Sequence, residues 1–534
     1  MKQHHKLTVA LCGAWAATLL YGEMFAFLLP SLWSCSWPHL SSVNSKINGV
    51  KAPSDYVKVA VLTDPQLMDR TSLRLPPKSL ALETAQFYTD LYMCRAFYLS
   101  ILPFKPDVIL FLGDYFDGGP YLSDEEWQES LNRFRHVFGM NAEGRYMDMQ
   151  VYFIPGNHDI GYESIISHKP EVVRRYVEGF GTRNFRFTVG KLEFIAVDAQ
   201  ILDGHPQENL ASMTWEFVKN VSADRQLMPR VLLTHIPLYR RDNTYCGPHR
   251  SSPVINQRIS RSAVGQEIMY QNYVTEESSN KLLELVKPAL ILSGHDHDQC
   301  TVIHESKYGP VVEHTVGTVS WQQGNLYPSF MLLSVSNSAN ANVSAPEDAL
   351  LSQLCFLPMQ THIYIWYLSL FILTILSLLF WPTSGISFGH YLSGLAACIR
   401  LYGGMFRGGT KEKSEDENCE YEMMWDAEGT MHLVKKPLDT PVSRQTEKAS
   451  VERGNAVMRP TARKNISQEM KISMNVDINA DVGHDPNKLL HRASKSKTKI
   501  IIQRLVRTFG MLIVIAAVNL PIYMMLLFKD WIDK

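Results

Sequence analysis

Short apolar runs alternate with amphipathic stretches between residues 57 and 336. Six of the runs are rich in Val, Ile, Leu and Phe and are typical of buried strands: residues 57–63, 108–112, 151–154, 194–197, 231–234 and 289–292. Residues 80–102 and 123–138 have helical spacing, and Ser123 and Glu126 form a capping-box pattern at the start of the second helix. Strands that alternate with helices predict an α/β fold built in layers.

Three longer apolar runs have the length of a membrane span. They cover residues 7–29, 363–381 and 508–528, close to the roughly 20 residues that a helix needs to cross a bilayer. We therefore expect an N-terminal anchor within residues 1–30 and further transmembrane helices at 361–381 and 508–528. Lys2 and Lys6 precede the first run and favour a cytosolic N-terminus, with a cleaved signal peptide as the alternative interpretation. Glu23 is the only charged residue in that first run.

Residues 400–507, between the second and third runs, are polar and contain few aromatic residues. This composition predicts a largely disordered loop. Its lysines and arginines close to the third run, including Lys495, Lys497 and Lys499, favour a cytosolic location. Residues 57–336 then form a domain on the lumenal side of the membrane.

The charge balance excludes one class of function. The 534 residues include 52 Lys and Arg against 53 Asp and Glu, a net charge of -1. A chain without an excess of basic residues has no net positive electrostatic field to attract a polyanion, so we expect no nucleic-acid partner. The 8 cysteines are too sparse for a small disulfide scaffold, so the fold must depend on an apolar core.

Ligand-type side chains follow five of the predicted strands. Because strand carboxyl ends share one edge of an α/β sheet, residues far apart in the chain meet there. A single Asp or His after a strand is usually structural, but five such positions together predict a binuclear metal site. The residues are Asp64, Asp114, Asn157 with His158, His235, and His295 with His297.

These motifs, in this order, resemble the five sequence blocks of calcineurin-like metallophosphoesterases. The blocks are Asp64-Pro65-Gln66, Gly113-Asp114-Tyr115-Phe116-Asp117, Gly156-Asn157-His158-Asp159, the strand end at His235, and Gly294-His295-Asp296-His297. The resemblance implies a layered β-sandwich flanked by helices. The segments His235-Ile236-Pro237 and Gly317-Thr318-Val319-Ser320-Trp321, together with the membrane anchors, further resemble the secretory-pathway phosphoesterases that remove ethanolamine phosphate from GPI anchors.

The resemblance implies a set of metal ligands. Asp114 would bridge two divalent ions, Asp64 and His297 would hold the first, and the second would be bound by Asn157, His235 and His295. Mn²⁺ is the expected metal, and Zn²⁺ or Fe are alternatives with the same mixed ligands. Much of the family has His where this chain has Gln66. Its carboxamide oxygen is a weaker ligand than imidazole, so direct ligation by Gln66 stays open, as does a degenerate, non-catalytic domain.

The resemblance also assigns catalytic roles. His158 would stabilise the transition state and protonate the leaving alkoxide, and Asp117 would hydrogen-bond and charge that imidazole, with helix capping as its alternative role. The insertion at 239–273 carries arginines, of which Arg240 and Arg241 lie nearest to His235. We expect these two to bind phosphate or an anionic head group, with a solvated surface as the alternative for each.

The function implied is a membrane-bound phosphodiesterase of the endoplasmic reticulum or Golgi that acts on the ethanolamine phosphate of GPI-anchored protein glycans. One alternative is a phosphomonoesterase or protein phosphatase, and another is a non-catalytic, metal-loaded GPI cargo receptor. In an oxidising lumen, Cys246 in the insertion and Cys300 beside His297 are expected to form a disulfide. The partners expected are the GPI glycan and the lipid bilayer.

Overall fold

The computed structural model describes residues 3–38, 56–73, 75–140, 149–205, 209–254, 257–263, 265–337, 349–380, 419–425, 431–437 and 486–532. The chain divides into two units, Met1–Phe380 with Ile502–Lys534, and Trp381–Ile501. Most of the expected disordered loop at 400–507 lies outside the described residues. Within it the structure has an antiparallel pair of strands, β14 (Cys419–Trp425) and β15 (Met431–Pro437), and the beginning of helix α12 (Pro486–Ile532).

Two mixed sheets form the centre of the first unit. The first has the order β13-β12-β1-β2-β3, and the second has the order β10-β11-β9-β6-β5-β4. Strands of the first sheet are β1 (Tyr56–Leu62), β2 (Val108–Phe111), β3 (Gln150–Phe153), β12 (Ser329–Ser336) and β13 (Leu350–Phe356). Those of the second are β4 (Phe185–Val189), β5 (Leu192–Ala196), β6 (Arg230–Leu233), β9 (Pro288–Ser293), β10 (Cys300–Ser306) and β11 (Gly309–Thr315).

All six predicted strands are present, within a few residues of their expected bounds, as β1, β2, β3, β5, β6 and β9. They read as continuous apolar runs because both faces of each sheet are covered. On β1, Val59 and Val61 face the second sheet, while Ala60 and Leu62 pack against helices. Each Val or Leu side chain removed from water in this way stabilises the fold by about 1.5 to 3 kcal/mol.

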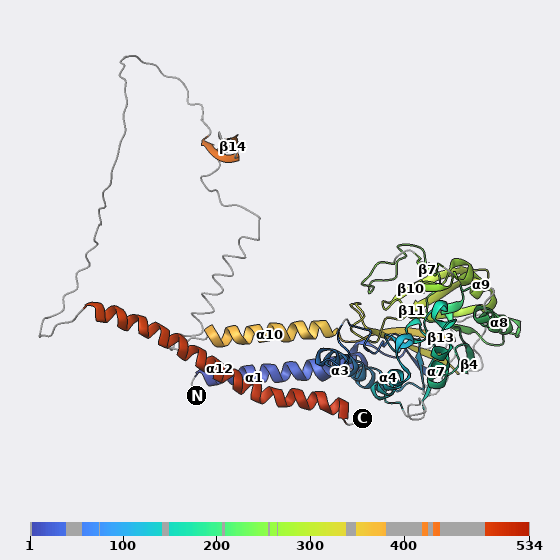
Figure 1. The fold of residues 1–534 in the computed structure, drawn as a ribbon, viewed down its shortest axis with the longest axis horizontal. Coiled ribbons are helices and arrows are strands. Elements are labelled where there is room, and N and C mark those ends of the chain that lie inside the picture. The colour runs from blue at the N-terminus through green and yellow to red at the C-terminus, as the bar shows by residue number, and fades with distance from the viewer. Residues whose placement is uncertain are drawn as a thin grey trace, which may run out of the picture. The chain divides into compact units, whose positions relative to one another are not determined.

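Helices cover the outer face of each sheet, which gives four layers (Figure 1). On the first sheet lie α3 (Leu80–Arg95), its π-helical continuation η3 (Ala96–Ile101), α4 (Asp124–Val137) and α7 (Pro170–Phe180). On the second lie α8 (Asn209–Ala223) and α9 (Glu276–Val286). The capping box predicted for α4 is formed, because Ser123 and Glu126 exchange hydrogen bonds. The layered α/β fold expected from the sequence is therefore confirmed.

In the part of the chain that the structure describes, three helical segments are long and apolar enough to cross a membrane: His5–Ser34, Gln360–Phe380 and Ile501–Lys529. The first comprises α1 (Gln3–Leu20), η1 (Tyr21–Phe25), α2 (Ala26–Leu29) and η2 (Pro30–Ser34), the second is α10 (Gln360–Phe380), and the third is part of α12. Helices α1 and α10 run side by side (Figure 1), and the indole of Trp15 donates a hydrogen bond to Thr374. Leu11, Leu378 and Ile515 form a small apolar cluster where the three segments meet.

A buried ionic cluster connects these segments to the layered domain. Arg95, at the end of α3, forms an ion pair with Glu23 of η1, and the side chains of both are only 3% exposed. Arg95 also donates to the carbonyl of Leu526 (3.0 Å), and Tyr367 donates to Glu23 (2.7 Å). Glu23 and Arg95 together therefore connect all three segments to the domain.

Two disulfides are present in the described residues. Cys246 pairs with Cys300, as the sequence predicted. Cys35 pairs with Cys355, which links the residue following η2 to β13. Disulfides of this kind form and persist in oxidising compartments.

Candidate metal centre

The predicted ligands come together at the carboxyl ends of strands from both sheets. Asp64 and Asp114 follow β1 and β2, which pair in parallel, and Asn157 begins the short helix α5 (Asn157–Ile160) after β3. His235 follows β6, and His295 and His297 follow β9, which is parallel to β6. Asp64, Asp114 and His235 are fully buried. The sheet therefore brings together the five motifs that the sequence placed after its strands.

Four of these residues have a left-handed backbone, which a non-glycine residue rarely adopts. The φ angles are 50° at Asp64, 56° at Asp114, 67° at His295 and 56° at His297. Each such residue costs about 1 to 3 kcal/mol, and the conformation persists only where surrounding contacts hold it. Thr318 supplies two of these contacts, because its hydroxyl donates to the carbonyl of Asp64 (2.6 Å) and its amide donates to that of His297 (3.0 Å).

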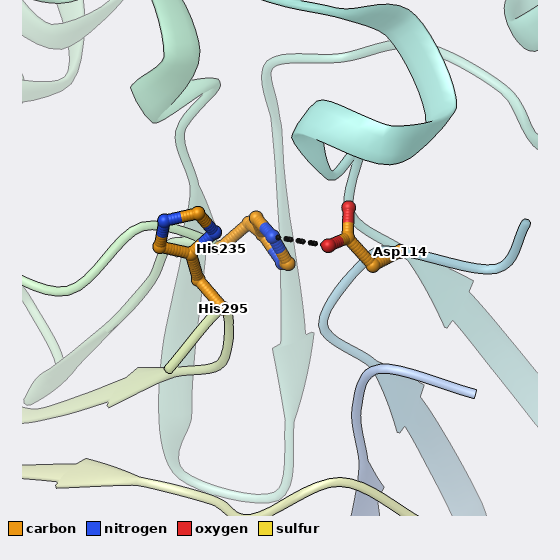
Figure 2. Close-up of side chains that lie close together, drawn as sticks. All are labelled: Asp114, His235 and His295. Carbon is orange, nitrogen blue, oxygen red and sulfur yellow. Dashed lines mark ion pairs between the residues drawn. The ribbon is translucent and has the colours of Figure 1, made fainter. Parts of the chain in front are cut away.

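Among the described residues, two groups of side chains that could hold a metal ion share Asp114. Asp114, His235 and His295 form one group, and Asp64, Asp114 and His297 form the other. Within each group the ligand atoms lie within 4.8 Å of one another. Figure 2 shows the first group, in which the Nε2 atom of His235 lies 3.2 Å from Asp114 Oδ2. This arrangement matches the division into two ion sites that the family resemblance implies, and the role of each residue as a ligand stays a prediction.

Backbone carbonyls determine which imidazole nitrogens remain for a metal. The Nδ1–H group of His235 donates to the carbonyl of Leu112 (2.7 Å), which leaves Nε2 towards Asp114. His295 uses Nε2 to donate to the carbonyl of Gln271 (3.1 Å), which leaves Nδ1. Metal-ligating histidines are usually oriented by such a hydrogen bond on the other nitrogen.

The charges of the site favour a bound cation. Burial lowers the pKa of His235, but the Asp114 carboxylate outweighs this effect and raises the pKa to about 9. Burial raises the pKa of Asp64, because the desolvated carboxylate lies beside a second buried carboxylate. Burial and the neighbouring His235 lower the pKa of His295 to about 3, so its ring is neutral, the form that binds metal. Two buried carboxylates beside the neutral imidazole of His295 fit a pair of divalent cations, and His235 would lose its proton on binding a metal.

The two carboxamide residues also lie in the site. The Oδ1 atom of Asn157 lies 3.2 Å from Nε2 of His235, so it faces the group formed by Asp114, His235 and His295. Gln66 is buried, and its Nε2 atom donates to Asp114 Oδ2 (3.1 Å). In this arrangement the amide of Gln66 orients the shared carboxylate, and direct ligation by its oxygen remains untested.

His158 and Asp117 lie together on the same side of the site. The Nδ1–H group of His158 donates to the backbone carbonyl of Asp117, and the carboxylate of Asp117 lies 3.7 Å from that nitrogen. Burial by itself lowers the pKa of His158, but the carboxylate of Asp114 and the contacts with Asp117 together outweigh burial and raise the pKa. The imidazole, whose side chain is 37% exposed, is therefore held in one orientation with its Nε2 atom available to carry a proton.

Three acids near the ligands have supporting roles. Asp159 accepts hydrogen bonds from the amides of Gly156, Asp114 and Tyr115, so it holds the loop after β2 in place. Asp296 forms ion pairs with Arg240 and Arg250. Asp298 accepts four hydrogen bonds from the amides and hydroxyls of two serines, Ser251 and Ser252. The insertion after His235 therefore binds both acids that alternate with His295 and His297.

The two arginines expected to contact substrate do not line the cavity that contains Asp114, His158 and His295. The Arg240 side chain is 1% exposed and pairs with Asp296 and Glu313, a position that favours a structural role. Arg241 is exposed. Both line a separate cavity of about 360 Å³ beside α9 and β10. A substrate-binding role for either stays a prediction.

Sequence reasoning missed the other wall of the site. Within the insertion at 239–273, β7 (Ile259–Arg261) and β8 (Ile268–Gln271) form an antiparallel pair of strands that was not predicted. Its residues Tyr270 and Asn272 line a cavity of about 600 Å³ together with Asp114, His158 and His295. Tyr121, from the turn η5 (Gly119–Tyr121), lines the same cavity. Both strands are short and partly exposed, so no hydrophobic period marks them.

Comparison with known proteins identifies the family of the layered domain. Residues 57–299 match the family of calcineurin-like phosphoesterases. This part of the chain is a calcineurin-like metallophosphoesterase domain. The family resemblance drawn from the five sequence motifs is therefore confirmed.

Relatives of the phosphoesterase domain extend beyond it into the flanking segments. The chain is 28% identical over 389 residues to Metallophosphoesterase 1 of Pongo abelii, covering 69% of this chain and 87% of that protein. It is 27% identical over 322 residues to Cell division control protein 1 of Saccharomyces cerevisiae, covering 58% of this chain and 63% of that protein. The alignment thus spans less than two thirds of the yeast protein. A purple acid phosphatase from yellow lupin seeds aligns at 12% identity with a TM-score of 0.33, covering 53% of this chain and 50% of that one.

Domains of this family act with a pair of divalent metal ions, and the ligands described above fit such a pair. When bound, the ions supply Lewis-acid stabilisation and lower the pKa of a water. The residues of the chain contribute the rest. Hydrogen bonds to backbone carbonyls orient the imidazoles of His235 and His295. The carbonyl of Asp117 holds His158, the imidazole that can carry a proton, beside them.

Proposed function

We propose that this chain is a membrane-anchored phosphodiesterase that removes ethanolamine phosphate from the glycans of GPI-anchored proteins in the early secretory pathway. The observation that carries the proposal is the sharing of Asp114 by two Asp/His groups in the cavity that also holds His158. A phosphodiester needs both positive charge for its oxygens and an acid for a poor leaving group.

The residues have separate roles in this reaction. The Asp/His groups would hold the two ions, with Mn²⁺ as the expected metal, and the bound ions would supply positive charge for the phosphate oxygens. Water attacks phosphorus, and His158 donates its proton to the sugar oxygen as the bond from that oxygen to phosphorus breaks, because the leaving alkoxide has a high pKa. Asp117 accepts the Nδ1–H group through its carbonyl, so it directs the opposite nitrogen towards the leaving group.

Membrane attachment and the two disulfides support a lumenal location for the domain. The bilayer is the expected second partner, since all three candidate spans belong to the same unit as the phosphoesterase domain. The pairs Cys35–Cys355 and Cys246–Cys300 are stable in the oxidising secretory pathway and rare in the cytosol.

The orientation has a direct test in N-glycosylation. Asn220, exposed near the end of α8, and Asn342 begin acceptor motifs that a lumenal domain could use, whereas Asn465 lies in the loop expected in the cytosol. Asn342 and Asn465 lie outside the described residues. A glycan on Asn465 with none on Asn220 or Asn342 would overturn the orientation.

The reaction is tested with the purified full-length protein, loaded with Mn²⁺ and supplied with a GPI glycan that carries ethanolamine phosphate. Mass spectrometry should detect release of phosphoethanolamine, and Asp114→Asn should abolish it. Much faster hydrolysis of phosphomonoesters would instead support the phosphomonoesterase alternative. Tight glycan binding without turnover would support the cargo-receptor alternative.

A further inference from the structure

Two exposed tyrosines line the cavity that contains the predicted metal ligands. Tyr121 is 57% exposed and Tyr270 is 43% exposed, although large aromatic side chains are mostly buried in this domain. Met269, 54% exposed, lies next to Tyr270 and lines the same cavity. Exposed apolar surface at the rim of a polar cavity is typical of a binding site.

Both tyrosines are held in place by contacts with their surroundings. The ring of Tyr270 meets that of Tyr162 edge to face at 6.0 Å, and the hydroxyl of Tyr162 donates to the carbonyl of Gln271 (2.8 Å). The carbonyl of Tyr121 accepts from Arg70, and the ammonium of Lys169 lies 5.6 Å from its ring centroid. The rings are therefore positioned before any ligand binds, which lowers the entropy lost on binding.

Polar groups of the cavity complement these rings. Thr71, Asp117 and Asn272 line it, and they offer acceptors and donors beside the aromatic surface. A pyranose ring likewise combines an apolar surface with polar groups, because its C–H face is apolar and its edge carries hydroxyl groups. A tyrosine, with a flat apolar ring and a polar hydroxyl, suits such a ligand.

The size of the cavity indicates that it holds more than the reacting group. A volume of about 600 Å³ exceeds what one phosphate and one ethanolamine fill, and it falls within the range of sites for larger ligands. The group on the other side of the phosphodiester must occupy the remaining space.

We infer that Tyr121 and Tyr270 form a sugar-binding subsite that takes the pyranose on the leaving-group side of the phosphodiester. This inference rests on the proposed function, and it adds the residues that select a glycan over a small diester. Stacking on these rings lowers the free energy of the bound sugar and of the transition state, so it raises kcat/KM for glycan substrates alone.

The test compares two substrates on the Mn²⁺-loaded full-length protein. One is a trimannoside carrying ethanolamine phosphate, and the other is methyl phosphoethanolamine, a diester without a sugar. The ratio of their kcat/KM values should fall about 10-fold in Tyr270→Ala and in Tyr121→Ala, in line with the cost of removing an aromatic stacking partner. Tyr270→Trp should restore the ratio. Tyr245→Ala, an exposed tyrosine that does not line this cavity, should leave the ratio at its wild-type value.

The outcomes separate the subsite from the reaction. An unchanged ratio in both alanine variants, with turnover intact in the wild type, would overturn the subsite and leave the proposed function standing. If the wild type hydrolysed neither diester, the proposed function would fail. Saturation-transfer NMR with phosphate-free trimannoside would then decide the inference: binding that the alanine variants lose would support it, and absence of binding to the wild type would overturn it.

Discussion

Arg250 forms a bidentate ion pair with Asp296, the residue that separates His295 from His297. Its Nη1 and Nη2 atoms lie 2.8 and 3.0 Å from the two carboxylate oxygens. The Arg250 side chain is largely buried. Because the neighbouring histidines have strained, left-handed backbones, a fixed Asp296 helps to hold both imidazoles in position.

We predict that Arg250→Met weakens metal binding. Loss of a contact that orients ligands typically costs 10-fold to 100-fold in metal affinity, and we expect a decrease of that size. The measurement is Mn²⁺ content at defined free concentrations of the ion. Arg258→Met, an exposed arginine of the same insertion, is the matched control and should bind as the wild type does. Equal affinities in the two variants would show that the ion pair does not support the ligands.

A second prediction concerns the bridging role of Asp114. Asp114→Ala should remove both metal equivalents, since this carboxylate belongs to both ligand groups. Gln66→His, by contrast, should tighten the first site, because imidazole is the stronger ligand. Both effects can be read by metal analysis of the purified variants. Two full equivalents in Asp114→Ala would refute the assignment.

The third prediction separates His158 from Asp117. His158→Ala should keep both metals but lose about 10²-fold to 10⁴-fold in turnover of the diester, the usual contribution of a general acid. Asp117→Asn should lose much less, because the contact to His158 is made by the backbone carbonyl, which this substitution retains. Single-turnover kinetics on metal-loaded protein would measure both. Full activity in His158→Ala would exclude it as the acid.

The fourth prediction concerns the buried ion pair of Glu23 and Arg95. Glu23→Gln leaves the guanidinium of Arg95 buried without its counter-charge, which should destabilise the protein by about 3 to 5 kcal/mol. Thermal unfolding in lipid nanodiscs would detect the loss, and adding Arg95→Met should recover part of it. Asp224→Asn, which breaks a half-exposed pair with Arg186, is the control and should cost less than about 1 kcal/mol. Similar losses in Glu23→Gln and Asp224→Asn would contradict this prediction.

The sequence predicted the strands and the residues at their ends because both leave local signals. A strand covered on both faces, such as β2, is a continuous apolar run, and a polar motif at its end is conspicuous. The partners of those residues leave no such signal. His295 is oriented by the backbone carbonyl of Gln271, and every residue type has such a carbonyl, so the sequence does not mark it. The pairing of Arg250 with Asp296 depends on the path of an irregular insertion.

For the three candidate spans, too, the sequence predicted the elements but not the contacts between them. Length and composition were enough to predict the three candidate spans, because a bilayer imposes both. The partner of Glu23 could not be predicted, since Arg95 lies in a helix of another layer, 72 positions along the chain. Only the packing of α3 against these segments reveals it.

The disulfide between Cys35 and Cys355 affects how the domain could be shed from the membrane. The domain is joined to the candidate spans by the chain between Cys35 and Tyr56 and by the chain between Phe356 and Gln360. Cleavage of both connections by a protease would still leave β13 bound through Cys355 to the residue that follows the first span. A soluble form produced by these two cuts therefore requires a reductant as well as a protease.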